Sequence, residues 1–407
     1  MFKLRLHTLM LLLNVVCLLC MGTMAIYSTT YTTDDNYYLT HQLMWIGVGI
    51  IAASVVALTP MEYLSKVSKL MLMGITLLLV YLVAATYLRK IFGAGVRLPL
   101  VVYAKGASRW IGYGGISVQP SEFAKFALIL FLSTYYGTRD IQKIEDTKEG
   151  LVMPLLVCLV VMSMIVLGKA LSNTILCGLI VFSIMFISGV KLRKLLAAIV
   201  IIGFCALLCI AAEPYRMKRI TNFISHRQTE VEWTTAPRSD DNHQLERSIC
   251  AIGSGGMFGL GMGRGRLKNK AIPESKTDFI FAVIGEEYGF AGVFAGIALY
   301  MLFMVLCFLI GNQCRERRGM LICMSVGLYV AAQAGLNLAV ICGLAPTTGV
   351  TAPLVSYGGS SIVSVMMCVG LVFNVSRQNI QEYIKEIVVE PADILFAGDV
   401  KEAENEG

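Results

Sequence analysis

The feature that most constrains this chain is a series of long apolar runs that recurs from its N-terminus almost to its C-terminus. Runs of about 18–25 residues are each long enough to cross the roughly 30 Å hydrocarbon core of a bilayer as a helix. We predict about ten such spans, at 8–27, 41–59, 70–88, 120–136, 150–168, 171–190, 193–212, 290–311, 320–344 and 358–375. The chain is therefore expected to be an all-α integral membrane protein.

Composition excludes an ordinary soluble enzyme. Hydrophobic residues make up 56% of the chain and charged residues 15%, whereas soluble domains carry about 25% charged residues. Lys3 and Arg5 precede the first apolar run, as in a signal peptide. That run is about 20 residues long, beyond the roughly 7–15 residues of a signal core, so we expect a retained helix. No nucleic-acid-binding module stands out.

The distribution of Lys and Arg predicts that both termini lie in the cytoplasm. Basic residues cluster in alternate short loops, at 66–69, 139–148, 191–194 and 315–318, whereas 28–40 and 345–357 contain none. Such clusters mark the cytoplasmic side of a membrane protein. Two long segments, 89–119 and 213–278, then lie outside, and long loops escape this rule.

These assignments predict a polytopic domain over residues 1–378, with a large extracytoplasmic loop at about 213–278 between the seventh and eighth helices. Residues 379–407 are polar and end in an acidic run, which predicts a solvated cytoplasmic tail. The twelve cysteines include no CxxC pair, and the four histidines are scattered. The sequence therefore predicts neither a disulfide framework nor a metal cluster of its own.

Asp278 is the strongest catalytic candidate. It lies in KNKAIPESKTDFIFAVIGEEYGF (268–290), where a basic loop runs directly into an apolar helix, with Lys276 two residues upstream. A carboxylate at a membrane edge, close to Lys and Arg, suits proton abstraction beside an anionic substrate. Three further acids are candidate supporting residues, or structural ones: Glu274, Glu286 and Glu287. Segment 278–289 is expected to lie along the interface or to turn its acids toward a cavity, because acids in a spanning helix are costly.

A second constellation is GASRWIGYGGISVQPSEFAKF (106–126). Pro120 suits the first turn of a helix, and Glu122 and Lys125 are three residues apart, so they share a helical face and can pair. This pair is compatible with a structural ion pair or with the lining of a polar cavity. Arg109, beside Trp110, fits an interfacial anchor or a phosphate ligand equally well. Gln119 is a further candidate substrate ligand.

Two glycine-containing segments complete the set. AIGSGGMFGLGMGRGRLKNK (251–270) fits no nucleotide-binding motif. It is either a tightly turned loop or a cradle of backbone amides for phosphates, with Arg264 and Lys268 beside it. GLAPTTGVTAPLVSYGGSS (343–361) interrupts the apolar pattern. Its hydroxyls, at Ser356, Ser360 and Ser361, suit either helix packing or bonds to a sugar or phosphate.

These blocks together resemble the membrane glycosyltransferases of the shape, elongation, division and sporulation (SEDS) family. RWIGYGGISVQPSEFAK, AIGSGGMFGLGMG, IPESKTDFIFAVIGEEYGF and GLAPTTGVTAPLVSYGGSS match that family's order and spacing. GMGRGRLKNK, IGEEYGF and TGVTAPLVSYGGSS are more similar to its cell-division branch than to its rod-shape elongation branch. One departure matters: the family usually carries PDxG where this chain has GKALSNT (168–174), so an acid is missing and Lys169 is present.

The resemblance implies a ten-helix enzyme that polymerises lipid II into glycan strands at the outer face of the bacterial cytoplasmic membrane. Undecaprenyl diphosphate is the leaving group, and the family's essential acid falls on Asp278. Arg109, Lys125, Lys276 and the basic run 264–270 are candidates to neutralise the diphosphate. A divalent cation, Mg²⁺ or Mn²⁺, is an alternative source of positive charge. The implied partners are a class B penicillin-binding transpeptidase and divisome membrane proteins.

Two other classes of function fit the same pattern. Ten helices around a polar cavity suit a lipid II flippase or another transporter, although Asp278 lies at a loop edge and not near the bilayer midplane. An inactive scaffold that activates a transpeptidase partner is the other alternative, because a fold can outlast its activity. The Asp278→Ala variant distinguishes these alternatives from an enzyme, since a transporter or scaffold should largely keep its role without this acid.

We predict that reversing the charge of Arg264, Arg266 and Lys268 together raises the KM for lipid II, because the basic run would attract the anionic substrate. Steady-state kinetics with labelled lipid II measure this effect. An unchanged KM would assign the run to a solvated loop.

Overall fold

The computed structural model describes residues 2–31, 37–93, 98–104, 107–114, 116–211, 240–265, 276–346 and 349–405. Its helices are α1 (Phe2–Tyr31), α2 (Tyr37–Leu58), α3 (Met61–Phe92), α4 (Pro120–Gly137), α5 (Ile141–Glu145), α6 (Met153–Leu167), α7 (Leu171–Ile187), α8 (Leu192–Ala211), α10 (Asp240–Gly255), α11 (Ile280–Asn312), α12 (Arg317–Ile341) and α13 (Gly359–Asn405). A π-helical turn, Lys148–Val152, precedes α6, and three strands occur at β1 (Val101–Ala104), β2 (Ala107–Tyr113) and β3 (Ile116–Val118).

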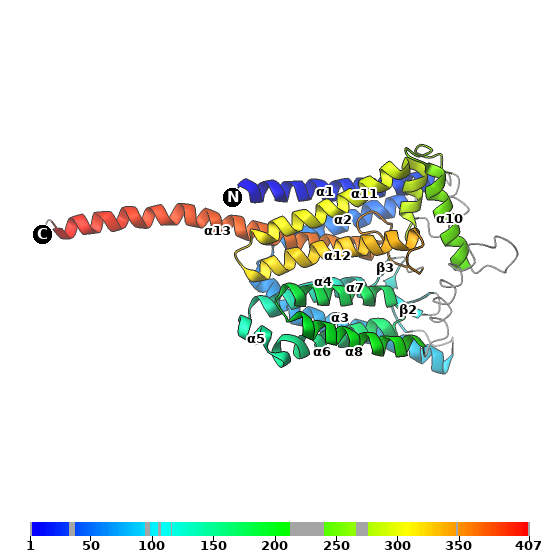
Figure 1. Cartoon of the computed structure of the whole chain (residues 1–407), viewed down its shortest axis with the longest axis horizontal. Helices are drawn as coiled ribbons and strands as arrows, with labels where there is room; N and C mark the ends of the chain where they lie inside the picture. Colours follow the sequence, from blue (N-terminus) through cyan, green and yellow to red (C-terminus); the bar gives the residue numbers. More distant parts are fainter. Residues whose placement is uncertain are drawn as a thin grey trace.

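Most of the helices lie along a common axis and form one bundle (Figure 1). Seven described segments are long and apolar enough to cross a membrane: Phe2–Thr30, Tyr37–Leu58, Met61–Phe92, Lys148–Leu167, Ile280–Asn312, Arg317–Ile341 and Gly359–Lys385. The other predicted spans, 120–136, 171–190 and 193–212, coincide with α4, α7 and α8. The all-α membrane fold is confirmed, while the count of ten crossings stays a prediction.

Several helices extend beyond the apolar spans predicted for them. Helix α3 covers 61–92 instead of 70–88, and α11 begins at Ile280 instead of at 290. In α11 the added turns pack inside the protein. Glu286 and Glu287 lie inside α11 and are each only 1% exposed.

Helices α12 and α13 lie at the centre of the bundle. The spanning window of α13 is 83% buried inside the protein and that of α12 is 61% buried, against 22% for α2 and for α3. Small residues permit close helix contact in membranes. At Gly370 of α13, a Cβ atom would lie 2.5 Å from the carbonyl oxygen of Ala53 in α2. The peripheral helices instead present apolar side chains to lipid.

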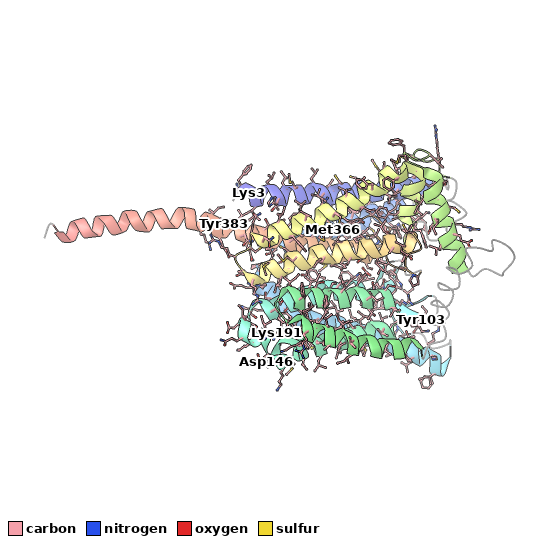
Figure 2. All side chains as sticks on the ribbon, in the orientation of Figure 1. Lys3, Tyr103, Asp146, Lys191, Met366 and Tyr383 are labelled. Carbon is pink, nitrogen blue, oxygen red and sulfur yellow. The ribbon has the colours of Figure 1, made fainter. Side chains whose placement is uncertain are left out.

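The two ends of the bundle differ. Figure 1 places α5 and both chain termini at one end, which we call the terminal end, and the strands and α10 at the other, which we call the sheet end. In Figure 2, Lys3, Asp146, Lys191 and Tyr383 lie at the terminal end, and Tyr103 lies at the sheet end. The labelled residues of the basic loops thus share one end, as the positive-inside rule requires.

A small antiparallel sheet, in the order β1-β2-β3, occupies the predicted loop 89–119. Val102 pairs with Trp110, and Gly112 pairs with Ser117. Sequence analysis missed this sheet because its strands are short and glycines interrupt their alternation. The sheet leads directly into Pro120, the first residue of α4, and so fixes the approach of Arg109 and Gln119 to the membrane.

The glycine-rich segment 256–265 packs against the first turns of α11. Its backbone amides donate to the carbonyl oxygens of Glu286 and Glu287, both at 3.0 Å. The carboxylate Oε1 of Glu287 accepts hydrogen bonds from Ser28 Oγ at 2.6 Å and from Gly263 N at 3.2 Å. These bonds favour the tight-turn interpretation of the segment over a phosphate cradle.

Two predicted polar regions contain helix. Within the predicted loop 213–278, residues 240–255 form α10, which is strongly amphipathic and packs on α11. Helix α13 continues across the predicted boundary at 378/379 to Asn405 and projects from the bundle at the terminal end (Figure 1). The division into a membrane domain and a polar tail stays a prediction.

We predict that Gly289→Ala lowers stability by about 1–3 kcal/mol. Gly289 interrupts α11 with φ 67° and ψ −162°, a conformation essentially restricted to glycine. A Cβ atom there would also lie 2.4 Å from the amide nitrogen of Gly259. The melting temperature of the purified variant measures the effect.

Gly335→Ala in α12 is the matched control, because nothing lies within 4 Å of a Cβ atom at that position. Its melting temperature should be unchanged or slightly higher. Equal melting temperatures for the two variants would contradict the prediction.

Candidate active site

Six of the residues predicted from the sequence line one cavity at the sheet end of the bundle. The cavity has a volume of about 420 Å³. The six are Arg109, Gln119, Glu122, Asp278, Ser360 and Ser361. Asn173, Gln333 and Thr351 add further polar side chains to its wall. Segments that are up to about 250 positions apart in the sequence therefore converge on one polar cavity.

Four helices begin at this cavity. Gln119 precedes α4, Asp278 lies two residues before α11, and Ser360 lies in the first turn of α13. Asn173 lies in the first turn of α7. The N-terminal end of a helix carries a partial positive charge and unpaired amide groups, which favour an anion nearby. The helix ends and Arg109 can therefore hold an anionic group beside the two lining carboxylates, Glu122 and Asp278.

The backbone around Asp278 is held by side chains from α12 and from the connection between α12 and α13. Asn337 Nδ2 donates to the carbonyl oxygens of Asp278 and Val350, both at 2.7 Å. Ser356 Oγ donates to the carbonyl oxygen of Thr277 at 2.5 Å. A Cβ atom on Gly349 would lie 3.4 Å from Asp278 Oδ2, so this glycine leaves room beside the carboxylate.

Glu122 and Lys125 form the predicted ion pair, and Glu122 also lines the cavity. Lys125 Nζ lies 2.8 Å from Glu122 Oε2 and is fully buried. It also donates to Gln333 Oε1 at 3.2 Å, and Gln333 Nε2 donates to the carbonyl oxygen of Thr351 at 3.0 Å. Both interpretations of the pair therefore hold at once. Lys125 lies behind the cavity wall and acts on the cavity through Glu122 and Gln333.

Arg109 combines an anchoring role with a place in the cavity wall. Its Nη2 donates to the carbonyl oxygen of Lys169 at 2.6 Å, and its Nε donates to that of Gly168 at 3.3 Å. These two carbonyl groups lie just beyond the C-terminal end of α6, where a positive charge is favourable. Nearby, Asn173 Nδ2 donates to Ser121 Oγ at 2.9 Å. A neutral amide thus lines the cavity from the 168–174 stretch that lacks the family's usual acid.

Lys276 lies at the edge of the cavity among aromatic side chains. Its Nζ is 3.7 Å from the centroid of the Tyr38 ring, and its carbonyl oxygen accepts from Tyr357 N at 2.9 Å. The rings of Tyr38 and Tyr357 contact edge-to-face, with centroids 5.2 Å apart. Burial raises the pKa of Tyr357, which lies in the α12–α13 connection. This shift favours the neutral phenol of Tyr357.

The remaining predicted residues do not line the cavity. Ser356 is buried and bonds to backbone, while Glu286, Glu287 and Arg264 lie with the glycine-rich segment. Lys268 and Glu274 fall outside the described residues, as do Arg266 and Lys270. In the described part of the chain, no group of three or more His, Cys, Asp or Glu side chains is placed to hold a metal ion.

Three residues of the site were not predicted from the sequence: Gln333, Asn337 and Trp45. Gln333 and Asn337 are four residues apart, so they lie on one face of α12, and both are buried. Amide side chains inside an apolar span are costly and mark functional positions, so this signal was available in span 320–344. Trp45 lines the cavity and packs against Gly359, where a Cβ atom would lie 2.3 Å from its ring. Nothing in span 41–59 singled it out.

Known proteins resemble this chain along nearly its whole length. A family model described as "Cell cycle protein", which spans FtsW, RodA and SpoVE, matches residues 3–381. "Probable peptidoglycan glycosyltransferase FtsW" of Methylomonas methanica is 30% identical over 382 residues, which cover 91% of this chain and 92% of that protein. "Stage V sporulation protein E" of Bacillus subtilis is 33% identical over 385 residues, with coverage of 91% and 96%.

A solved structure agrees with the fold. A chain from "Structural coordination of polymerization and crosslinking by a peptidoglycan synthase complex" superimposes with a TM-score of 0.73 and 23% identity. The superposition covers 91% of this chain and 98% of that one. At this level of identity, the match supports the arrangement of the helices alone.

We predict that Lys125→Met lowers stability by about 3–5 kcal/mol, because it leaves the buried carboxylate of Glu122 without its cation. Thermal unfolding of the detergent-purified variant measures this change. The double variant Glu122→Gln/Lys125→Met removes both charges and should recover most of the lost stability. A single variant as stable as the wild type would show that the pair does not hold the cavity wall.

Proposed function

The chain belongs to the family of cell cycle proteins that includes FtsW, RodA and SpoVE, and we propose that it polymerises lipid II into peptidoglycan glycan strands. It is a membrane-embedded peptidoglycan glycosyltransferase that acts in septal wall synthesis and releases undecaprenyl diphosphate. The observation that carries this assignment is a cavity in which Asp278 stands among the first turns of four helices. The relatives named as FtsW support the septal role.

The electrostatics of the cavity suit a diphosphate-linked donor. The N-terminal ends of α4, α7, α11 and α13 all face a region where a leaving diphosphate would carry negative charge. Arg109 lines this region, and Lys276 lies at its edge. These fixed charges stabilise the departing diphosphate. No nucleotide is needed for this step. The bond energy for polymerisation comes from the donor itself.

Asp278 serves as the general base. Its carboxylate takes the proton from the acceptor's sugar hydroxyl while that oxygen attacks the anomeric carbon of the donor. The bond between the anomeric carbon and the diphosphate oxygen breaks, and its electron pair leaves with the diphosphate. The products are a glycan strand one unit longer and undecaprenyl diphosphate.

The other lining residues orient the two sugars. Glu122, Gln119, Ser360 and Ser361 offer hydrogen-bond donors and acceptors to sugar hydroxyls. Trp45 and other aromatic side chains supply flat apolar surface within the same wall. The polar groups would fix the orientation of the bound sugars, and the aromatic rings would add apolar contact.

The orientation follows from the same assignment. The sheet end faces outward, where lipid II is polymerised, and both termini lie in the cytoplasm of a bacterium, with the basic loops at the terminal end. A class B penicillin-binding transpeptidase is the partner that would cross-link the new strand, alongside divisome membrane proteins. The related synthase complex joins polymerisation and crosslinking in one assembly.

We predict that Asp278→Asn lowers glycan synthesis by about 10²–10⁴-fold, because the acceptor hydroxyl loses its base. The purified protein, with and without a candidate transpeptidase, is incubated with labelled lipid II, and glycan strands are resolved on a gel. Glu246→Gln in α10 is a matched control, since it makes the same change of carboxylate to amide away from the cavity lining. It should retain normal synthesis.

Full activity of Asp278→Asn would remove Asp278 as the base. Absence of polymer from the wild-type protein with every partner would instead favour the flippase or scaffold alternatives. A liposome flipping assay then separates those two.

A further inference from the structure

A second and larger cavity, of about 940 Å³, lies toward the terminal end of the bundle between α3, α4 and α6. Its volume is at the upper end of the roughly 300–1,000 Å³ that ligand pockets occupy. It shares no lining residue with the candidate active site. The proposed glycosyl transfer therefore leaves this groove without a role.

The walls of this groove are apolar and run into the membrane. Leu72 and Met73 of α3, Phe131 of α4, and Val157 and Val161 of α6 line them. The α3 wall extends from residue 65 to residue 76, which at 1.5 Å per residue is about 16 Å. This length is about half of the roughly 30 Å hydrocarbon core. With its mouth included, the groove thus spans about the thickness of one leaflet along α3.

The mouth of the groove is basic. Lys66, Lys69 and Arg139 line it, with Glu149 as the only acid among its lining residues. Arg139 Nε lies 3.9 Å from Glu149 Oε2, and its guanidinium carbon is 3.5 Å from the centroid of the Tyr135 ring. One acid thus faces three cations, and the surplus positive charge lies where the groove reaches the membrane surface.

Some cations at the same end are held by acids, whereas among the described residues the two lysines of the groove are not. Lys191 lies 3.3 Å from Glu145, and Arg318 lies 2.7 Å from Glu316. Within the described part of the chain, neither Lys66 nor Lys69 makes an ion pair, and both are exposed. Two cations beside an apolar groove are therefore available to a ligand that combines a negative head with an apolar body.

We propose that this groove binds one anionic phospholipid from the leaflet at the terminal end, with its phosphate at Lys66 and Lys69 and an acyl chain along the apolar walls. Any groove that faces lipid holds acyl chains, so the distinctive property is selection of the headgroup charge. Basic pockets between transmembrane helices recognise anionic headgroups in this way. A soluble phosphate would contact only the mouth and would leave the apolar walls unfilled.

Native mass spectrometry of the purified full-length protein tests this proposal. Phosphatidylglycerol and phosphatidylcholine with identical acyl chains are titrated separately. We expect tighter binding of phosphatidylglycerol, and we expect Lys66→Gln/Lys69→Gln to weaken that binding by about 10–30-fold, given the attraction of each lysine to an anionic lipid. Phosphatidylcholine binding should not change. Lys143→Gln/Lys148→Gln is the matched control, because it removes two lysines at the same end but outside the groove.

A second variant tests the walls. Val157→Trp fills the groove without changing its charge and should also weaken phosphatidylglycerol binding, while elution as a single folded peak shows that the bundle is intact. Equal affinity for the two lipids would overturn the proposal. So would an equal loss of phosphatidylglycerol binding in Lys143→Gln/Lys148→Gln, because the attraction would then be a diffuse surface effect. Competition by water-soluble glycerol phosphate at the concentration of the lipid would also overturn it, because the walls would then contribute nothing.

Discussion

The buried ion pair between Glu122 and Lys125 is the interaction on which the cavity at the sheet end depends. Inside a membrane bundle, neither charge is stable without the other. The pair joins three helices, because Lys125 bonds Gln333 of α12 and Ser364 of α13 donates to the carbonyl oxygen of Glu122 at 2.7 Å. These helices contribute Glu122, Gln333, Ser360 and Ser361 to the cavity wall, so a requirement of electrostatics also helps to set the shape of the site.

Irregular backbone at this end is stabilised by amide and hydroxyl side chains. The α12–α13 connection contains non-helical backbone next to spanning helices, where unpaired carbonyls would be costly. Gln333, Asn337 and Ser356 bond to the carbonyls of residues 277, 278, 350 and 351. The catalytic candidate Asp278 is thus placed by a hydrogen-bond network, as a base that must meet a substrate hydroxyl requires.

Both ends of the molecule carry cations beside a cavity, but the walls of the two cavities differ. At the sheet end, Arg109 and four helix N-termini border a polar cavity, the proposed site of the reacting diphosphate. At the terminal end, cations lie at the mouth of an apolar groove, the proposed site of a lipid that does not react. The walls explain the two proposed roles, because polar side chains orient a substrate whereas apolar walls only hold an acyl chain.

The sequence alone determined the membrane class, most of the helices and the place of Asp278 at a helix start. These are local properties, since hydrophobic length and a charge at the edge of an apolar run are readable from neighbouring residues. Only the tertiary structure decided that Glu122 lines a cavity while Lys125 stands behind it, and that the glycine-rich segment packs on α11. It also decided that Trp45 and Asn337 join the site, because their partners lie far away in sequence, and helix packing brings them together.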